Sequence, residues 1–180
     1  VEADGDLASK AAAHLLEAGG KRVRPVLCLL VAKAYPPHEL PPAVTLLAQV
    51  AELVHNSTLL HDDVIDLGDT RRDRPTSRVI YGNAASVLGG DLLLVQALGL
   101  IEAAGVPHLL ASMLDVLRRM IAAESQQLES RGRVDVSEAG YFAVAEGKTA
   151  SLFGTAAEGG AMVAGGRNDC HCGLCFGPER

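Results

Sequence analysis

The stretch LLAQVAELVHNSTLLHDDVID, residues 46–66, joins a long apolar pattern to a sudden concentration of charge at its end. Apolar residues recur at spacings of three and four positions, for example at Leu47, Val50 and Val54, which is the period of one face of an α-helix. The pattern predicts a helix over residues 40–66. Because apolar residues cover most of its circumference, we expect this helix to be buried.

A polar stripe runs along the same predicted helix. Residues three, four or seven positions apart share a helix face, and those that do so here are Glu52, His55, Leu59, Asp62 and Asp66. Two carboxylates one turn apart repel each other modestly, so Asp62 and Asp66 favour a bound cation. Carboxylate oxygens without a nearby thiolate suit Mg²⁺, which one or two carboxylates typically hold together with water and substrate phosphates.

The neighbouring Asp63 lies about 100° around the helix from Asp62. Two interpretations of its role stay open: contact with a metal-bound water, or capping of a neighbouring group. For the acidic cluster as a whole, a solvated helix end is the simpler alternative.

Helical periodicity extends along nearly the whole chain. It predicts helices over residues 6–18, 24–35, 40–66, 77–104, 107–131 and 137–164. Glycine, proline and polar turn residues separate these segments, and we find neither a strand pattern nor an internal repeat. Ser137, followed by Glu138, is expected to cap the last helix. We predict an all-α fold, an antiparallel helical bundle over residues 1–164 that is followed by a tail at 165–180.

Composition narrows the classes of function. The 180 residues carry a formal net charge of −6, which disfavours a general nucleic-acid binder because such proteins usually present a basic domain or stripe. The apolar runs are far shorter than the roughly 20 residues needed to span a bilayer. The first residues show neither the basic segment nor the apolar segment that are typical of a secretory signal. We therefore expect no membrane span and a cytoplasmic location.

The four cysteines divide into two groups. Cys28 lies in an apolar run and is expected in the core. The other three, Cys170, Cys172 and Cys175, crowd around His171 near the end of the sequence. A zinc site and a flexible, oxidation-prone tail both remain open interpretations of this group.

Basic residues cluster at two points. GGKRVRP (19–25) places Lys21, Arg22 and Arg24 where a loop meets a predicted helix, and RRDRPT (71–76) follows the acidic stretch. Arginine and lysine side chains near a helix N-terminus make a favourable diphosphate site. Acidic metal ligands and basic phosphate ligands together imply a phosphorylated substrate that is bound partly through Mg²⁺.

Four motifs together resemble the trans-isoprenyl diphosphate synthases, the all-α polyprenyl synthetases. They are GGKRVRP (19–25), LVHNSTLLHDDVID (53–66), RRDRPT (71–76) and EGKTASLF (146–153), and their order and spacing agree with the family over about residues 15–164. The resemblance implies an isoprenoid-synthase helical bundle and a Mg²⁺-dependent prenyltransferase. Such an enzyme joins isopentenyl diphosphate to an allylic diphosphate.

The resemblance also implies roles for individual residues. Isopentenyl diphosphate would be bound by Lys21, Arg24, His55 and Arg72. The allylic diphosphate would be bound by Arg71, Lys148 and Thr149, of which the last two would also act on the leaving group and the developing cation. Asp62 and Asp66 would be the metal ligands. In the family, bulky residues four and five positions before the first aspartate limit chain length, and the small Thr58 and Ser57 here imply a medium- or long-chain product. Family members commonly dimerise, so a homodimer is expected, and a heterodimer is an alternative.

The sequence departs from the family pattern in one respect. Family members carry a second aspartate-rich motif on a later helix, and nothing resembling it follows residue 164. Either the 180 residues are part of a longer chain, or the protein is a degenerate member. The alternative function is a non-catalytic or regulatory subunit of a prenyl diphosphate synthase. A terpene cyclase is a weaker alternative, because GGKRVRP implies a second diphosphate site.

Overall fold

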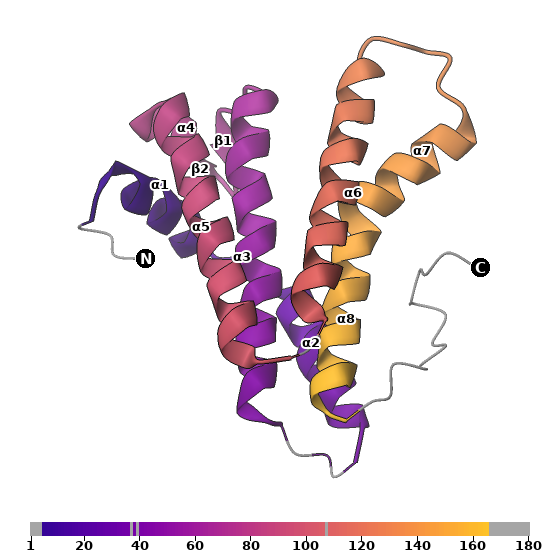
Figure 1. Cartoon of the computed structure of the whole chain (residues 1–180). Helices are drawn as coiled ribbons and strands as arrows, with labels where there is room; N and C mark the ends of the chain where they lie inside the picture. Colours follow the sequence, from indigo (N-terminus) through magenta and orange to yellow (C-terminus); the bar gives the residue numbers. More distant parts are fainter. Residues whose placement is uncertain (1–4, 37, 39, 107, 166–180) are drawn as a thin grey trace. The chain divides into compact units, whose positions relative to one another are not determined.

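In the computed structural model, which describes residues 5–36, 38, 40–106 and 108–165, the chain is built almost entirely from helices joined by short connections (Figure 1). The elements in chain order are α1 (Leu7–Glu17), α2 (Val23–Ala34), α3 (Pro42–Ile65), β1 (Thr70–Arg71), β2 (Arg74–Pro75), α4 (Ser77–Tyr81), α5 (Asn83–Ala104), α6 (Leu109–Glu129), α7 (Glu138–Ala145), the π-helix η1 (Glu146–Ala150) and α8 (Ser151–Val163). The predicted all-α class is confirmed. The cysteines at 170, 172 and 175 and His171 lie outside the described residues.

Three local expectations were wrong. The predicted helix over 77–104 is broken at Gly82, which has a φ of 88° and separates α4 from α5. The predicted helix over 137–164 contains the π-helix η1 between α7 and α8. The turn at 68–76 contains a two-stranded antiparallel hairpin, in which Thr70 pairs with Pro75 and Arg71 with Arg74. Short strands of this kind are set by turn geometry, which hydrophobic periodicity does not report.

The expected cap at Ser137 is confirmed. Its hydroxyl oxygen accepts a hydrogen bond from the Gly140 backbone N–H at 3.1 Å, at the start of α7. Asp6 caps α1 in the same way, because its carboxylate accepts from the Ser9 N–H at 2.8 Å. That hydrogen bond lowers the pKa of Asp6 below its usual value.

The chain divides into two compact units. The first comprises Val1–Val23 and Gln49–Ala103, and the second comprises Arg24–Ala48 and Ala104–Arg180. Each unit is built from segments that are far apart in the sequence, and α3 contributes to both.

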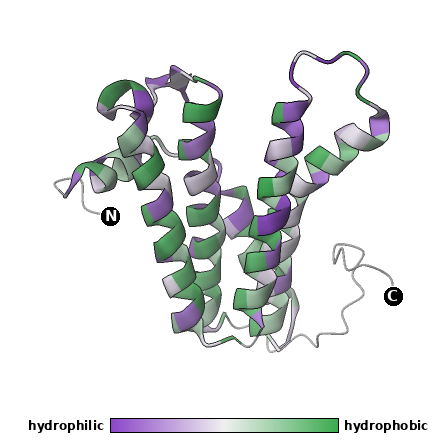
Figure 2. Ribbon diagram, turned by 45° about the horizontal axis from the view of Figure 1, so that its top comes forward, coloured by the Kyte–Doolittle hydropathy of each residue, from purple (hydrophilic) through white to green (hydrophobic). Residues whose placement is uncertain are grey.

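The first unit packs α1, the C-terminal part of α3 and α5 around a small apolar core. Ala12, Leu15, Leu60 and Leu93 form a buried cluster, and α3 and α5 run side by side with hydrophobic residues along their lengths (Figures 1 and 2). Serine hydroxyls tie the elements together: Ser77 donates to the Ala11 carbonyl and Ser86 to the Leu60 carbonyl, both at 2.8 Å. These bonds satisfy polar groups that are buried with the core.

The second unit brings the backbones of α2 and α8 into close contact. A Cβ atom at Gly160 would lie 2.3 Å from the Cys28 carbonyl oxygen, so only glycine permits this approach. Cys28 itself is fully buried, as predicted, and burial raises the pKa of its thiol from 9.0 to about 11.

Helix α5 is long and apolar enough to cross a membrane by length and composition alone. Its buried residues, which include Leu93, Ala97 and Ile101, pack inside the first unit. The core helix of a soluble protein passes the same test, so this feature is weak support for a membrane span.

Candidate functional site

Helix α3 presents two of the predicted acidic residues at its C-terminal end. The Asp66 backbone N–H donates to the Asp62 carbonyl at 2.7 Å, which continues the helical pattern one residue past the end of α3 at Ile65. The two carboxylates therefore share one face of this helical end. Asp62 is half-buried and Asp66 is exposed.

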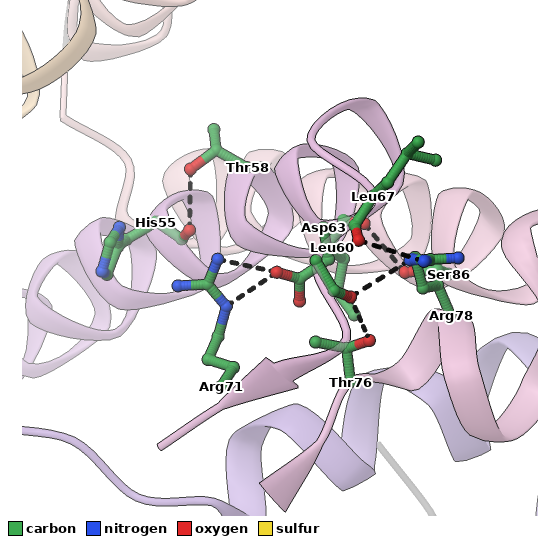
Figure 3. A network of polar contacts seen from close by, with 10 residues as sticks. His55, Thr58, Leu60, Asp63, Leu67, Arg71, Thr76, Arg78 and Ser86 are labelled. Carbon is green, nitrogen blue, oxygen red and sulfur yellow. Dashed lines mark hydrogen bonds and ion pairs between the residues drawn. The ribbon is translucent and has the colours of Figure 1, made fainter. Parts of the chain in front are cut away.

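Asp63 has a different role from its two acidic neighbours. It is only 2% exposed, and its Oδ1 accepts two hydrogen bonds from Arg71, from Nε at 2.9 Å and from Nη2 at 2.7 Å (Figure 3). Its other oxygen, Oδ2, is buried and has no hydrogen-bond partner within the described part of the chain. Of the two interpretations left open by the sequence, capping of a neighbouring group is the one that matches this geometry. Arg71 is the group it holds.

The hairpin positions Arg71 and Arg72 differently. Arg71 belongs to β1, whereas Arg72 and Asp73 form the turn and have φ values of 54° and 62°. Two consecutive residues with positive φ are typical of the tight turns that match the twist of a hairpin. The side chain of Arg71 reaches Asp63 of α3, and Arg72 is directed to another segment of the same unit.

Side chains beyond the hairpin fix the loop that leads into it. Thr76 Oγ1 donates to the Gly68 carbonyl at 2.7 Å, and Arg78 Nε donates to the same oxygen at 3.1 Å (Figure 3). Arg78 Nη2 also donates to the Leu67 carbonyl at 3.1 Å. The Gly68 N–H in turn donates to the Asp63 carbonyl at 2.9 Å. The loop is therefore tied both to the end of α3 and to the start of α4.

Arg72 packs against the loop between α1 and α2. A Cβ atom at Gly20 would lie 2.9 Å from Arg72 Nη2 and 3.0 Å from its Cζ, and Gly20 also has a φ of 146°. Only glycine combines this backbone conformation with room for the guanidinium. Arg72 Nη1 is buried without a hydrogen-bond partner among the described residues. The next residue, Lys21, is exposed, so two cationic groups predicted to bind isopentenyl diphosphate belong to adjoining segments.

The remaining predicted residues of α3 lie one to two turns before Asp62. His55 is half-buried, and its carbonyl accepts from Thr58 Oγ1 at 2.8 Å (Figure 3). Ser57 is 2% exposed. The predicted chain-length residues are thus a buried serine and a half-buried threonine whose hydroxyl is bound to its own helix.

Lys148 lies in the second unit, in the π-helix η1. Its Nζ donates to Gln127 Oε1 at 3.0 Å and forms an ion pair with Glu124 Oε2 at 2.5 Å, both on α6. Glu124 Oε1 is buried without a hydrogen-bond partner in the described residues. Thr149, the other residue predicted in this motif, is exposed. π-Helical turns inside α-helices occur frequently at functional sites.

A close approach of α6 and η1 accompanies this arrangement. A Cβ atom at Gly147 would lie 2.7 Å from Ala123 Cβ and 3.1 Å from the Arg119 carbonyl oxygen. A cavity of about 250 Å³ lies beside Gly147, with Arg119, Gln126 and Glu146 among its polar lining. Neither Lys148 nor Thr149 belongs to that lining, so the predicted site residues do not define this cavity.

Arg24 also belongs to the second unit. Its guanidinium carbon lies 4.4 Å from the centre of the Phe153 ring of α8, a cation–π distance. Helix α2 begins at Val23, so Lys21 precedes the helix and Arg24 lies within it. The two residues therefore do not lie on one helical turn.

The predicted site residues divide between the two units. The first unit holds Lys21, His55, Asp62, Asp66, Arg71 and Arg72, and the second holds Arg24, Lys148 and Thr149. Sequence reasoning proposed the holding role of Asp63 as one of two alternatives, but it missed four other residues that contact these side chains: Gly20, Glu124, Gln127 and Phe153. Glu124 and Gln127 are three positions apart on one predicted helix, and this spacing could have indicated that they share a face and contact the same side chain.

The acidic residues form a pair and not a larger cluster. Among the described residues, no group of three or more His, Cys, Asp or Glu side chains is placed to hold a metal ion. Asp62 and Asp66 thus offer two carboxylates on one face, while Asp63 is bound to Arg71. This donor set fits a hard ion such as Mg²⁺, which commonly takes one or two carboxylates and completes its coordination with water and phosphate oxygens.

Comparison with known proteins gives a consistent result. The polyprenyl synthetase family model matches residues 6–174. An all-trans-nonaprenyl-diphosphate synthase (geranyl-diphosphate specific) of Rhodobacter capsulatus is 39% identical over 84% of this chain and 46% of its own length. The octaprenyl diphosphate synthase of Escherichia coli is 35% identical over 92% of this chain and 50% of its own length.

Solved structures agree with these sequence relatives. A decaprenyl diphosphate synthase from Rhodobacter capsulatus aligns with a TM-score of 0.83 and 36% identity, over 88% of this chain and 48% of its own. A geranylgeranyl pyrophosphate synthetase from Geoglobus acetivorans aligns with a TM-score of 0.84 and 30% identity, over 90% of this chain and 54% of its own. The chain therefore spans about half the length of the relatives that it matches.

Proposed function

The chain belongs to the polyprenyl synthetase family, and we propose that it acts in a trans-prenyltransferase that condenses isopentenyl diphosphate with an allylic diphosphate. The observation that carries the proposal is the arrangement of charge in the first unit. Asp62 and Asp66 lie on one face at the end of α3, and the hairpin that follows carries Arg71 and Arg72. A site that combines carboxylates with guanidinium groups suits a substrate that is bound both through a metal ion and directly through its phosphates.

Asp62 and Asp66 are the residues that would hold Mg²⁺. The ion, when bound, would neutralise charge on the departing diphosphate. Arg71, held in place by Asp63, would hydrogen-bond the allylic diphosphate. The family resemblance also assigns Lys148 and Thr149 to the allylic diphosphate, to which they would contribute an ammonium group and a hydroxyl.

The second substrate would be bound by the other predicted basic residues. Lys21 and Arg72 occupy adjoining segments of the first unit, and Arg72 Nη1 is buried without a protein partner among the described residues. A phosphate oxygen would satisfy that donor. We propose that His55 and Arg24 complete the binding of isopentenyl diphosphate.

The reaction balances without an additional reagent. The allylic C–O bond breaks and its electron pair leaves with the diphosphate, while the π-electrons of isopentenyl diphosphate form the new C–C bond to the allylic carbon. The adduct then loses one proton to restore a double bond. The released diphosphate accepts that proton, so the reaction needs no side chain as a base.

We propose that the product is longer than fifteen carbons. Ser57 and Thr58 are small residues at the positions where bulkier ones limit chain length in the family. The names of the nonaprenyl and octaprenyl relatives are in keeping with a long product. Replacing Thr58 with phenylalanine is expected to shorten the product, which chromatography of the dephosphorylated prenols would measure.

We also propose that the chain forms a homodimer through α5. Val87, Leu88 and Val95 are exposed on this helix, by 38%, 56% and 66%, and large apolar side chains that gather on one surface often mark interfaces. Analytical ultracentrifugation of the wild type and of Val95→Glu would test this. A dimer that survives the substitution would place the interface elsewhere.

The proposed reaction is tested by incubating the protein with isopentenyl and farnesyl diphosphates, with and without Mg²⁺, and measuring diphosphate release and product length. The proposal predicts metal-dependent release that is lost in Asp62→Asn, whereas Asp115→Asn, at an exposed position of α6, retains it. Absence of turnover in a protein that still binds both diphosphates would indicate a non-catalytic subunit instead.

A further inference from the structure

The loop between α1 and α2 contains a residue in an uncommon backbone conformation. Arg22 has a φ of 49°, a region that side chains with a Cβ rarely adopt. Such a conformation persists only where surrounding contacts determine it. The loop carries Lys21 immediately before this residue, so the contacts of Arg22 bear directly on where Lys21 lies.

The guanidinium of Arg22 is bound on two sides by its own unit. Its Nη1 donates to Glu52 Oε1 of α3, and its Nη2 donates to the Leu16 carbonyl of α1 at 3.1 Å. The Glu52 side chain is only 14% exposed. Arg22 thereby connects the last turn of α1 to the middle of α3.

Asn56 holds Glu52 in the orientation that Arg22 requires. Its Nδ2 donates to Glu52 Oε1 at 2.9 Å and to the Glu52 carbonyl at 2.7 Å. Asn56 is fully buried. A buried amide bound to a carboxylate fixes that carboxylate's rotamer, so the acceptor for Arg22 is preorganised.

The same loop is restrained from another direction by Arg72. The guanidinium of Arg72 packs on the backbone of Gly20. Lys21 therefore lies between a residue packed by Arg72 and a residue anchored by Glu52, while its own side chain is exposed. The loop is therefore restrained on both sides of Lys21.

We propose that Arg22, Glu52 and Asn56 form a positioning network that fixes Lys21 for binding isopentenyl diphosphate. This inference rests on the proposed function and extends it to residues outside the predicted set of ligands. Arg22 and Glu52 contact protein groups, so they are positioning residues. Their effect is selective for the diphosphate that Lys21 binds, because the allylic diphosphate is assigned to Arg71 and Lys148.

The test measures the dissociation constants of isopentenyl diphosphate and of farnesyl diphosphate with Mg²⁺, by titration calorimetry on the whole chain. Arg22→Lys keeps the positive charge but removes the fork that bridges Glu52 and Leu16. Arg22→Gly relieves the backbone conformation and removes the anchor. Arg133→Gln, an exposed arginine whose partner is Asp135, is the matched control.

For isopentenyl diphosphate we expect both Arg22 variants to bind about tenfold more weakly, while farnesyl diphosphate changes by less than about twofold. The control is expected to resemble the wild type for both ligands. Equal weakening for both ligands would indicate a general structural defect and overturn the inference. Unchanged isopentenyl diphosphate binding in Arg22→Gly would overturn it as well, because the loop would then need no anchor.

A second measurement separates this inference from the proposed function. If the wild type binds neither diphosphate, the proposed function is rejected. Hydrogen exchange of the backbone amides at residues 19–22 then decides whether the anchor exists. Faster exchange of these amides in Arg22→Lys than in the wild type supports anchoring, whereas identical exchange overturns it.

Discussion

Replacing Asp63 with asparagine preserves the size of a buried side chain and removes the charge that Arg71 binds. The Asp63 side chain is 3% exposed and that of Arg71 31%, so water solvates only one of the two partners. Both hydrogen bonds from Arg71 end on the same oxygen, Oδ1. The substitution therefore changes the strength of two contacts without creating a cavity.

The expected cost follows from the burial of the pair. Removing one partner of a fully buried ion pair costs about 3–5 kcal/mol, and a hydrogen bond to a charged group contributes about 1.5–3 kcal/mol. Arg71 keeps some access to water, and the asparagine oxygen still accepts a neutral hydrogen bond. We therefore expect Asp63→Asn to lower the free energy of unfolding by about 2 kcal/mol.

Asp69 provides a matched control within the same segment. It forms an ion pair with Arg78 at 2.8 Å, but its side chain is 77% exposed. Exposed ion pairs contribute little, so Asp69→Asn should cost below about 0.5 kcal/mol. Arg78 also keeps its hydrogen bonds to the carbonyls of Leu67 and Gly68.

Urea unfolding followed by circular dichroism would measure both variants. For a protein of this size, 1 kcal/mol corresponds to roughly 2–4 °C in Tm, so Asp63→Asn should also melt at a clearly lower temperature. If the two variants are equally stable, the Asp63–Arg71 contact is not a buried ion pair and the reasoning fails. Weaker binding of farnesyl diphosphate in Asp63→Asn alone would connect the same contact to the proposed site.

Three further predictions concern the second unit. Gly160→Ala places a Cβ against the Cys28 carbonyl and should cost about 2–3 kcal/mol in urea unfolding. Gly159→Ala, its neighbour, meets the ends of the Leu47 and Leu109 side chains, at 3.1 and 3.7 Å, and should change stability by under about 1 kcal/mol. Because burial raises the pKa of the Cys28 thiol to about 11, its alkylation at pH 8 should be slow in a peptide-resolved mass-spectrometric assay. Its contribution to stability should be complete below pH 9 and should fall as the pH approaches 11. Ser137→Ala removes the cap of α7 and should cost about 1 kcal/mol by the same unfolding assay.

Hydrophobic periodicity predicted the long helices well. The segments expected over 6–18, 24–35, 40–66 and 107–131 correspond to α1, α2, α3 and α6 within a few residues at each end. Each buries one apolar face, and periodicity reports exactly that property of a sequence. Gly82 was the available signal for the break before α5, but an isolated glycine is often tolerated inside a helix.

Hydrophobic periodicity could not predict the π-helix or the hairpin. The π-helix η1 contains Gly147, which packs against Ala123 and the backbone of Arg119, and these packing partners lie more than twenty positions away in the sequence. The hairpin depends on Arg72 and Asp73 adopting positive φ. Neither feature leaves a repeating apolar pattern, because each is decided by tertiary contacts and turn geometry.

The charged residues also show which features the sequence pattern predicts and which depend on tertiary contacts. Periodicity gives only the angle around a helix, so it grouped Asp62 with Asp66 and separated Asp63, but it did not identify the partner of Asp63. The structure identifies that partner, because Asp63 forms an ion pair with Arg71, just as Glu52 forms one with Arg22. Each basic cluster therefore has one arginine, Arg22 or Arg71, that is paired with a carboxylate of the first unit. The repulsion within the acidic stretch is accordingly reduced to the pair Asp62 and Asp66, which is the pair that a bound cation would relieve.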